Sequence, residues 1–193
     1  MKLNLRIIIQ NFKEKLPPEI RFFLTRVFVL FICWKLIYHL FLFPYRILDK
    51  PLTNITTQLS SYTYEKLYKN STTSYFETID KQGIGKAIIY INHKRSIGVG
   101  DNCNGLELHI LFIGFLFCFR TTLLKKIKFI AFGGLLTFIL NVLRVTFLAR
   151  MNFLEYKYAD FAHHYLFKMI IYSIIFLIWI YYIKNIRFIN EDN

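Results

Sequence analysis

The chain has 193 residues, of which 55% are hydrophobic and 19% aromatic, and its formal net charge is +13. Soluble domains contain about 45–50% apolar residues, so this composition excludes an ordinary water-soluble domain as well as a disordered chain. Strongly basic proteins often bind nucleic acid, but here most basic residues flank apolar runs, which is typical of membrane topology. We therefore expect one compact domain in a lipid bilayer, without a nucleic-acid partner.

The N-terminal residues 1–21 are basic and contain the break Pro17-Pro18. This pattern predicts a short amphipathic helix lying on the cytoplasmic surface of the membrane. The apolar segment that follows is too long for a signal peptide and lacks small residues at its end. We therefore expect an anchor that is not cleaved.

Four apolar segments are long enough to cross a hydrocarbon core of about 30 Å, which takes about 20 helical residues. They span residues 22–43, 104–124, 129–149 and 161–183. The sequence thus predicts an all-α integral membrane protein with about four transmembrane helices in a single membrane domain, residues 1–193.

Residues 44–103 separate the first two segments and form a long polar loop. Within it, residues 53–69 predict a helix, because side chains that share one helix face recur at helical spacing. These side chains belong to Ile55, Leu59, Tyr62, Lys66 and Leu67.

The second half of this loop has two further patterns. Residues 70–82 are rich in Ser and Thr, which predicts an irregular segment. Residues 86–92 and 96–100 predict two strands joined by a turn at 93–95. We therefore expect a short β-hairpin before the second apolar segment.

Short basic connectors mark one side of the membrane. The N-terminal arm, residues 120–128 and residues 184–187 carry clustered Lys and Arg, and the positive-inside rule assigns them to the cytoplasm. The opposite side receives residues 44–103 and 150–160, so the long loop is expected to be extracytoplasmic.

Three reactive residue types fall at the outer ends of these segments. Cys103 precedes the second segment, and Arg144 lies near the outer end of the third. His163 and His164 open the fourth, and because neighbouring helices run in opposite directions, the topology brings the whole set to one membrane face. Such a set can perform nucleophilic acyl transfer: an imidazole activates the thiol, the thiolate attacks a carbonyl, and the guanidinium stabilises the oxyanion.

Two polar residues share helix faces with this set. Glu107 lies four residues after Cys103. It either orients the site or forms an ion pair with Arg144 or His109. Asn141 lies three residues before Arg144, and its position predicts a side-chain hydrogen bond between helices.

Asp160 precedes His163 and His164. It either sets the tautomer of His164 or caps the fourth helix, and the capping role is favoured. Together with Cys103 these residues include metal-ligand types, but adjacent histidines rarely bind one tetrahedral ion together. We expect neither a metal ion nor another cofactor.

The three cysteines do not suggest a disulfide. Cys118 lies 15 residues after Cys103 on the same predicted helix, about 22 Å away, and Cys33 lies in the middle of the first apolar segment. Cys33 and Cys118 are expected to be packing residues, which leaves the Cys103 thiol free.

Three short motifs follow one another in the second half of the chain. They are Cys103-Asn104-Gly105-Leu106, Asn141-Val142-Leu143-Arg144-Val145, and His163-His164 ahead of an aromatic-rich last helix. In order, spacing and membrane side they resemble the exosortase/archaeosortase family, and the closest likeness is to the short exosortases of type F from Bacteroidetes. The resemblance covers roughly residues 95–183.

This resemblance implies a membrane-embedded cysteine protease or transpeptidase. The family's cysteine corresponds to Cys103, its arginine to Arg144, and its histidine to His164 in preference to His163. The implied partners are secreted proteins with a C-terminal sorting signal, which consists of a short motif, a transmembrane helix and a basic cluster. The implied location is the bacterial inner membrane, with the active site facing the periplasm.

A different interpretation is a non-enzymatic membrane scaffold or a small transporter, in which Arg144, Glu107 and His109 form a buried polar network. An enzyme needs the cysteine, the arginine and a histidine to converge, whereas a transport path needs polar residues throughout the membrane. The centre of the predicted membrane region is largely apolar apart from Lys35. This distribution favours the enzyme.

Overall fold

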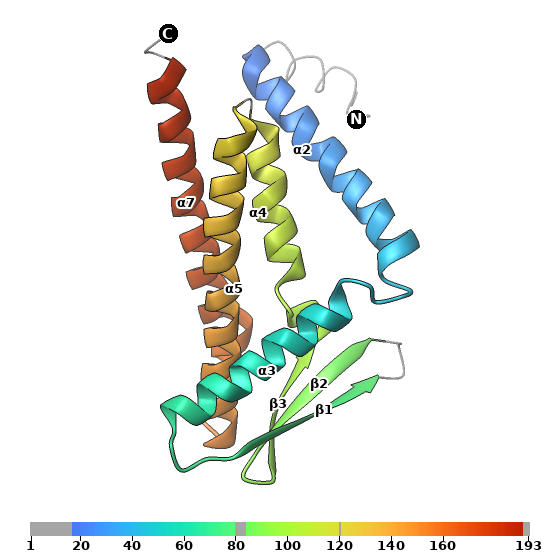
Figure 1. The fold of residues 1–193 in the computed structure, drawn as a ribbon, viewed down its shortest axis with the longest axis vertical. Coiled ribbons are helices and arrows are strands. Elements are labelled where there is room, and N and C mark those ends of the chain that lie inside the picture. The colour runs from blue at the N-terminus through green and yellow to red at the C-terminus, as the bar shows by residue number, and fades with distance from the viewer. Residues whose placement is uncertain (1–16, 80–83, 120, 191–193) are drawn as a thin grey trace, which may run out of the picture.

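The computed structural model describes residues 17–79, 84–119 and 121–190, so most of the amphipathic helix expected over residues 1–21 lies outside the described residues. Within the described residues, four long helices run along the molecule, and one more helix lies with a three-stranded sheet at one end (Figure 1). The helices along the molecule are α2 (Pro18–Ile37), α4 (Leu106–Cys118), α5 (Leu123–Phe153) and α7 (Phe167–Asn190).

The two ends of this helix bundle differ in what they hold. The start of α2, the α4–α5 connection and the end of α7 lie at one end, which we call the basic end (Figure 1). The helix α3 (Asp49–Leu67) and the sheet lie at the other, which we call the sheet end. The described parts of the basic connectors thus lie at one end of the bundle and the long loop at the other, while the membrane side of each end stays a prediction.

Two helical stretches of the described residues are long and apolar enough to cross a membrane, Leu123–Phe153 and Ala159–Asn185. The second stretch combines α6 (Ala159–Phe161), the π-helical turn η3 (Ala162–Leu166) and most of α7. The predicted number of four spans is therefore not confirmed. Helix α4 has only 13 residues, or about 20 Å of helix, because the backbone becomes extended at Phe119.

Two basic side chains of α2 contact polar groups of α4. Arg26 Nη1 donates to the carbonyl oxygen of Cys118 at 3.0 Å, where the last carbonyls of α4 present the negative end of the helix dipole. Near the sheet end, Lys35 Nζ lies 3.6 Å from Glu107 Oε1. These contacts join the two helices and compensate two of the charges that interrupt the first apolar segment.

The sheet consists of β1 (Thr73–Ile79), β2 (Gly85–Ile91) and β3 (Lys94–Gly100), paired antiparallel in that order. The predicted hairpin corresponds to β2 and β3 and is confirmed. The irregular segment predicted over residues 70–82 is wrong, because β1 pairs with β2 from Thr73 opposite Ile91 to Ile79 opposite Gly85. Its β-branched and aromatic residues favour a strand, so the all-α prediction does not hold at this end.

Helix α3 forms where a helix was predicted, but its faces are reversed. The side chains chosen as its defining stripe are exposed, including Ile55 at 47%, Leu59 at 39% and Tyr62 at 57%. The buried side chains of α3 are mostly polar. They belong to Asp49, Thr53, Thr56, Thr57, Ser60, Ser61 and Tyr64.

Apolar side chains pack in two clusters. The cluster at the sheet end joins α3, the sheet and α5 and contains Tyr64, Ile89, Ile91, Val99, Val145 and Ala149. The second lies among the long helices and contains Phe112, Leu116, Ile171, Ile175 and Tyr182. The first cluster holds β3 against α5, and the chain passes directly from the end of β3 into the candidate site.

Candidate functional site

Cys103 lies in a short connection between the sheet and the bundle. It is the last residue of the 3₁₀ turn η2 (Asp101–Cys103), which follows β3 and precedes α4. The side chain is half-buried and its thiol is free, as are those of Cys33 and Cys118. The nucleophile predicted at a helix N-terminus therefore lies in a turn, separated from α4 by two residues.

Asp101, two residues before Cys103, is buried and fully hydrogen-bonded. It accepts from Arg46 Nε at 2.7 Å and Nη2 at 3.0 Å, from Thr53 Oγ1 at 2.8 Å, and from the backbone N–H of Gly85 at 3.1 Å. The carboxylate's hydrogen bond raises the pKa of Arg46, so the pair is ionic. Four donors match the acceptor capacity of a carboxylate, and they tie the turn to α3 and β2.

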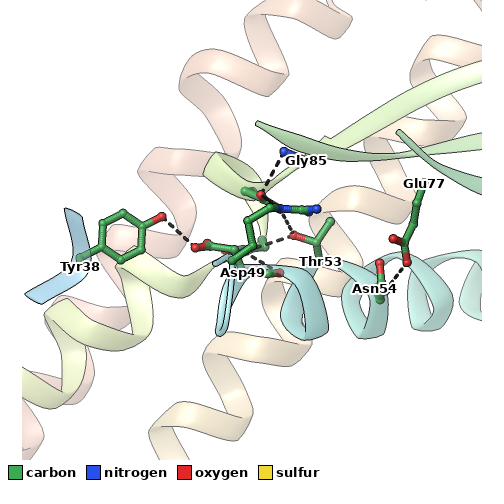
Figure 2. Close-up of polar contacts among 9 residues, drawn as sticks. Tyr38, Asp49, Thr53, Asn54, Glu77 and Gly85 are labelled. Atoms are coloured by element: carbon green, nitrogen blue, oxygen red, sulfur yellow. Dashed lines mark hydrogen bonds and ion pairs between the residues drawn. The ribbon is translucent and has the colours of Figure 1, made fainter. Parts of the chain in front are cut away.

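Asn104, directly after Cys103, belongs to a second buried cluster. Its Nδ2 donates to Asp49 Oδ1 at 3.0 Å, and the other Asp49 oxygen accepts from the Tyr38 hydroxyl at 2.9 Å (Figure 2). Asn104 Oδ1 accepts from the backbone N–H of Leu106 at 2.9 Å, which satisfies a donor in the first turn of α4. Asp101 and Asn104, which flank Asn102 and Cys103 in the sequence, are thus both held by buried hydrogen bonds.

Two glycines allow these close contacts. Gly105 has φ +89°, a left-handed conformation that side chains disfavour, and a Cβ there would lie 3.0 Å from Asn141 Nδ2. A Cβ on Gly85 would overlap the Arg46 guanidinium, with its nearest atom at 1.6 Å. Sequence analysis assigned no role to this network, although the polar residues on either side of Cys103 were the available signal.

Asn141 connects α5 to the turn η2, which holds Cys103 and is called the nucleophile turn below. Its Nδ2 donates to the backbone carbonyl of Cys103 at 3.4 Å, which is a side-chain hydrogen bond between elements of the kind predicted. The side chain is completely buried, yet its Oδ1 has no hydrogen-bond partner among the described residues. One acceptor beside the turn is therefore left open.

Arg144 lies one helical turn after Asn141 on α5 and is only 7% exposed. Its Nε has no hydrogen-bond partner in the described part of the chain, and no carboxylate there forms an ion pair with it. A buried guanidinium stays charged and is costly unless it is paired. None of the described residues completes the hydrogen bonding of Arg144 Nε or Asn141 Oδ1, so both atoms are available to a further polar group.

The two histidines differ in their surroundings. His163 is half-buried and close enough to Arg144, Asp160 and Lys168 to interact electrostatically with them. His164 is exposed and packs edge to face on His163, with ring centroids 4.9 Å apart. The structure thus brings Arg144 into the neighbourhood of a histidine, and through Asn141 into the neighbourhood of the Cys103 backbone.

The expected cap by Asp160 is not present. Tyr158 occupies the N-cap of α6, no side chain caps that helix, and Asp160 is exposed within it. The helix starts earlier than the apolar pattern indicated, which moves Asp160 past the capping position. Its charge acts on His163 instead.

Glu107 forms neither of the ion pairs predicted for it. Its carboxylate faces Lys35 on α2 and is 78% exposed, while the ring nitrogens of His109 lie 2.7 Å from the Gly105 carbonyl and 3.2 Å from that of Gly134. The prediction missed these partners because the sequence does not reveal which face of α4 meets α2.

The described residues contain no group of three or more His, Cys, Asp or Glu side chains placed to hold a metal ion. The four residues considered for such a site all lie in the described region. Near the sheet end the described residues present a free thiol, a buried guanidinium, a half-buried imidazole and an amide oxygen without a partner.

The family model described as transmembrane exosortase matches residues 22–181. No curated protein and no solved structure matches the chain. The match is to the family as a whole, and the assignment to type F stays a prediction. Because the matched region covers most of the chain and includes all three motifs, the protein belongs to the transmembrane exosortase family.

Proposed function

We propose that this protein is a cysteine protease or transpeptidase that processes secreted proteins at the outer face of the bacterial inner membrane. Family membership supports a role in the sorting or processing of proteins at a membrane. The substrates would carry a C-terminal sorting signal of a short motif, a transmembrane helix and a basic cluster. The bundle would cross the bilayer with its sheet end in the periplasm.

The observation that carries this proposal is the unpaired Arg144. A permanent positive charge that is 7% exposed and lacks a partner for Nε is a large cost to a membrane protein unless it has a function. It lies one turn from Asn141, which holds the Cys103 carbonyl. A substrate carbonyl that becomes an oxyanion would supply the missing acceptor.

The reaction has two acyl-transfer steps. A histidine takes the proton of the Cys103 thiol, and the thiolate attacks the scissile carbonyl carbon to form a tetrahedral oxyanion facing Arg144. The carbon–nitrogen bond then breaks, the imidazolium protonates the departing amine, and a thioester remains on Cys103. Water or a second amine attacks the thioester, which releases a shortened or a transferred protein.

Two features support His163 as the base, although the family resemblance favoured His164. His163 is half-buried and interacts with Arg144, whereas His164 is exposed. In this assignment His164 packs against the base and does not transfer a proton.

The decisive experiment uses the full-length protein expressed with a secreted reporter that ends in a sorting signal from the same genome. Cys103→Ala should abolish the change in reporter mass, and Cys103→Ser should be almost as inactive, because a hydroxyl is far less ionised than a thiol. Cys33→Ala and Cys118→Ala are the matched controls and should retain activity. Normal processing by Cys103→Ala, at an unchanged level of membrane protein, would overturn the enzyme proposal and favour the scaffold.

The same assay separates the two histidines. His163→Ala should be inactive and His164→Ala should retain most activity. Residues that act as one catalytic unit are not additive, so adding His163→Ala to Cys103→Ala should have no further effect. An inactive His164→Ala beside an active His163→Ala would transfer the role of base to His164.

A further inference from the structure

Helix α3 has the reverse of the pattern expected for a helix on a protein surface in water. Its buried face is made mostly of Asp, Ser and Thr, and six of these polar side chains are at most 6% exposed. Its opposite face presents Ile55, Leu59 and Tyr62, which are 39–57% exposed. In water a helix buries its apolar stripe and exposes its polar one. The exposed face of α3 is therefore suited to lipid and not to water.

The small polar side chains of the buried face bring α3 close to α5. Ser60 Oγ donates to the Val142 carbonyl at 3.2 Å, and Thr146 Oγ1 donates to the Ser60 carbonyl at 3.3 Å. Small residues and hydrogen bonds between helices of this kind are typical of helix contacts at membrane depth. The centre of α3 is thus fixed to a known position along α5.

That position gives the depth of α3. Val142 and Thr146 lie seven and three residues before Ala149, where the apolar segment of α5 ends. At 1.5 Å per residue, Ser60 therefore lies about 5–10 Å inside the end of that segment. This is the depth at which interfacial amphipathic helices rest, about 5–10 Å into the boundary between headgroups and acyl chains.

The exposed apolar surface of α3 continues that of α2. Large apolar side chains of α2 and of the turn after it are exposed up to Leu40 and Phe41, and the linker to α3 adds Tyr45 and Ile47. Helix α3 crosses the long helices instead of running along them (Figure 1). At its far end Lys66 Nζ lies 5.4 Å from the ring centroid of Tyr62, a pair with an apolar body and a polar tip that suits an interface.

We propose that α3 lies in the outer membrane interface, with the face formed by Ile55, Leu59 and Tyr62 covered by lipid acyl chains of the outer leaflet. The buried face of α3 carries Thr53 and Asp49, which bind Asp101 and Asn104 on either side of Cys103. Insertion of α3 into lipid therefore sets the depth of the nucleophile turn. This inference takes the side of the membrane from the proposed function, in which the sheet end lies in the periplasm, and does not depend on the proposed reaction.

The experiment measures the depth of single nitroxide labels on the full chain in vesicles of phosphatidylethanolamine and phosphatidylglycerol. The three native cysteines are replaced by Ala, and a single cysteine is introduced by Leu59→Cys, by Ile55→Cys or by Tyr62→Cys. Relaxation by oxygen, which concentrates in lipid, is compared with relaxation by a water-soluble nickel chelate. Leu177→Cys on the exposed side of α7, within a stretch long and apolar enough to cross a membrane, is the lipid reference. Glu155→Cys, exposed at the sheet end, is the water reference.

We expect the ratio of oxygen to nickel accessibility at all three α3 positions to exceed that of the Glu155→Cys label several-fold and to approach that of the Leu177→Cys label. A ratio equal to that of the Glu155→Cys label would mean that α3 faces water and would overturn the proposal. Labels accessible to neither reagent would overturn it too, because protein, either a second copy or a bound substrate helix, would then cover the face. Three independent exposed positions keep the test valid if one variant fails to assemble.

Discussion

Two buried charged groups near Cys103 have opposite environments. Asp101, on the sheet side of the turn, accepts four hydrogen bonds, two of them from the cation that neutralises it. Arg144, on the bundle side, has no hydrogen bond or ion pair among the described residues, and its Nε is completely buried. Protein groups complete the first arrangement, whereas none of the described residues pairs with Arg144.

Under the proposed function, this difference separates a structural polar group, Asp101, from a functional one, Arg144. A fully paired buried carboxylate stabilises one conformation of the turn, and its removal leaves Arg46 unpaired. An unpaired buried guanidinium destabilises the protein without bound substrate, and an acceptor on the substrate would remove that destabilisation. Stability measurements should therefore respond mainly to Asp101, and activity measurements mainly to Arg144.

The largest effect on stability is expected for Asp101→Ala. Breaking a buried pair by removing one partner costs about 3–5 kcal/mol, which should appear as a lower free energy of unfolding in detergent micelles. Adding Arg46→Met should recover part of the loss, because the unpaired charge is then gone. Glu77→Ala removes an exposed carboxylate of β1 that accepts a solvent-exposed hydrogen bond from Asn54, and this control should lower stability far less. If Asp101→Ala and Glu77→Ala lowered the free energy of unfolding equally, the structural role assigned to Asp101 would be wrong.

The next effect concerns activity and is expected for Arg144→Met. Loss of one donor to an oxyanion lowers kcat by about 10²–10³, while the Tm should stay the same or rise, because an unpaired buried charge is removed. Arg144→Lys should also be nearly inactive, since an ammonium does not reproduce the guanidinium geometry. A large fall in Tm with normal processing would make Arg144 a structural residue.

A smaller effect is expected for Gly105→Ala, at the junction of the two regions. The left-handed backbone costs about 1–3 kcal/mol for a residue with a side chain, and the new Cβ would press on Asn141. Processing should fall together with stability. Gly114→Ala is the control, because nothing lies within 4 Å of its added Cβ and alanine favours a helix. If both variants behave alike, the contact between Gly105 and Asn141 has no importance.

The smallest effect is expected at the exposed pair of Lys94 and Glu155. The hydrogen bond and the charge of Lys94 lower the pKa of Glu155, so the pair contributes stability above the ordinary glutamate pKa and loses it as the pH falls through the lowered value. Glu155→Gln should therefore reduce the Tm slightly at pH 7 and not at pH 3, as measured by thermal unfolding. The opposite dependence on pH would contradict the ion pair.

The predictions from sequence were most accurate where a single segment carries its own signal. The apolar length of residues 129–149 predicted α5, and the alternating residues of 86–92 predicted β2. The motif around Cys103 was found because cysteine, asparagine and glycine occur together before an apolar run. By contrast, the strand at 73–79 was missed, because its Ser and Thr residues favour loops when no partner strand is known.

The partners of charged residues could not be predicted, because they depend on which helix faces meet. Glu107 pairs with Lys35 on α2, which lies 72 positions earlier in the chain. Asp101 receives Arg46 and Thr53 from positions 55 and 48 residues away. Such contacts arise from packing across the fold and leave no local pattern.

The sequence by itself determined the membrane class, the family and the three motifs that bear reactive side chains, because hydropathy and short motifs are properties of contiguous residues. Only the tertiary structure decided that α3 turns its polar face inward, that Asp101 is paired and that Arg144 is not. The physical reason is that burying a polar group can either raise or lower the free energy of unfolding. A buried polar group stabilises the fold when other segments of the chain supply its donors and acceptors, and it is left unpaired when they do not.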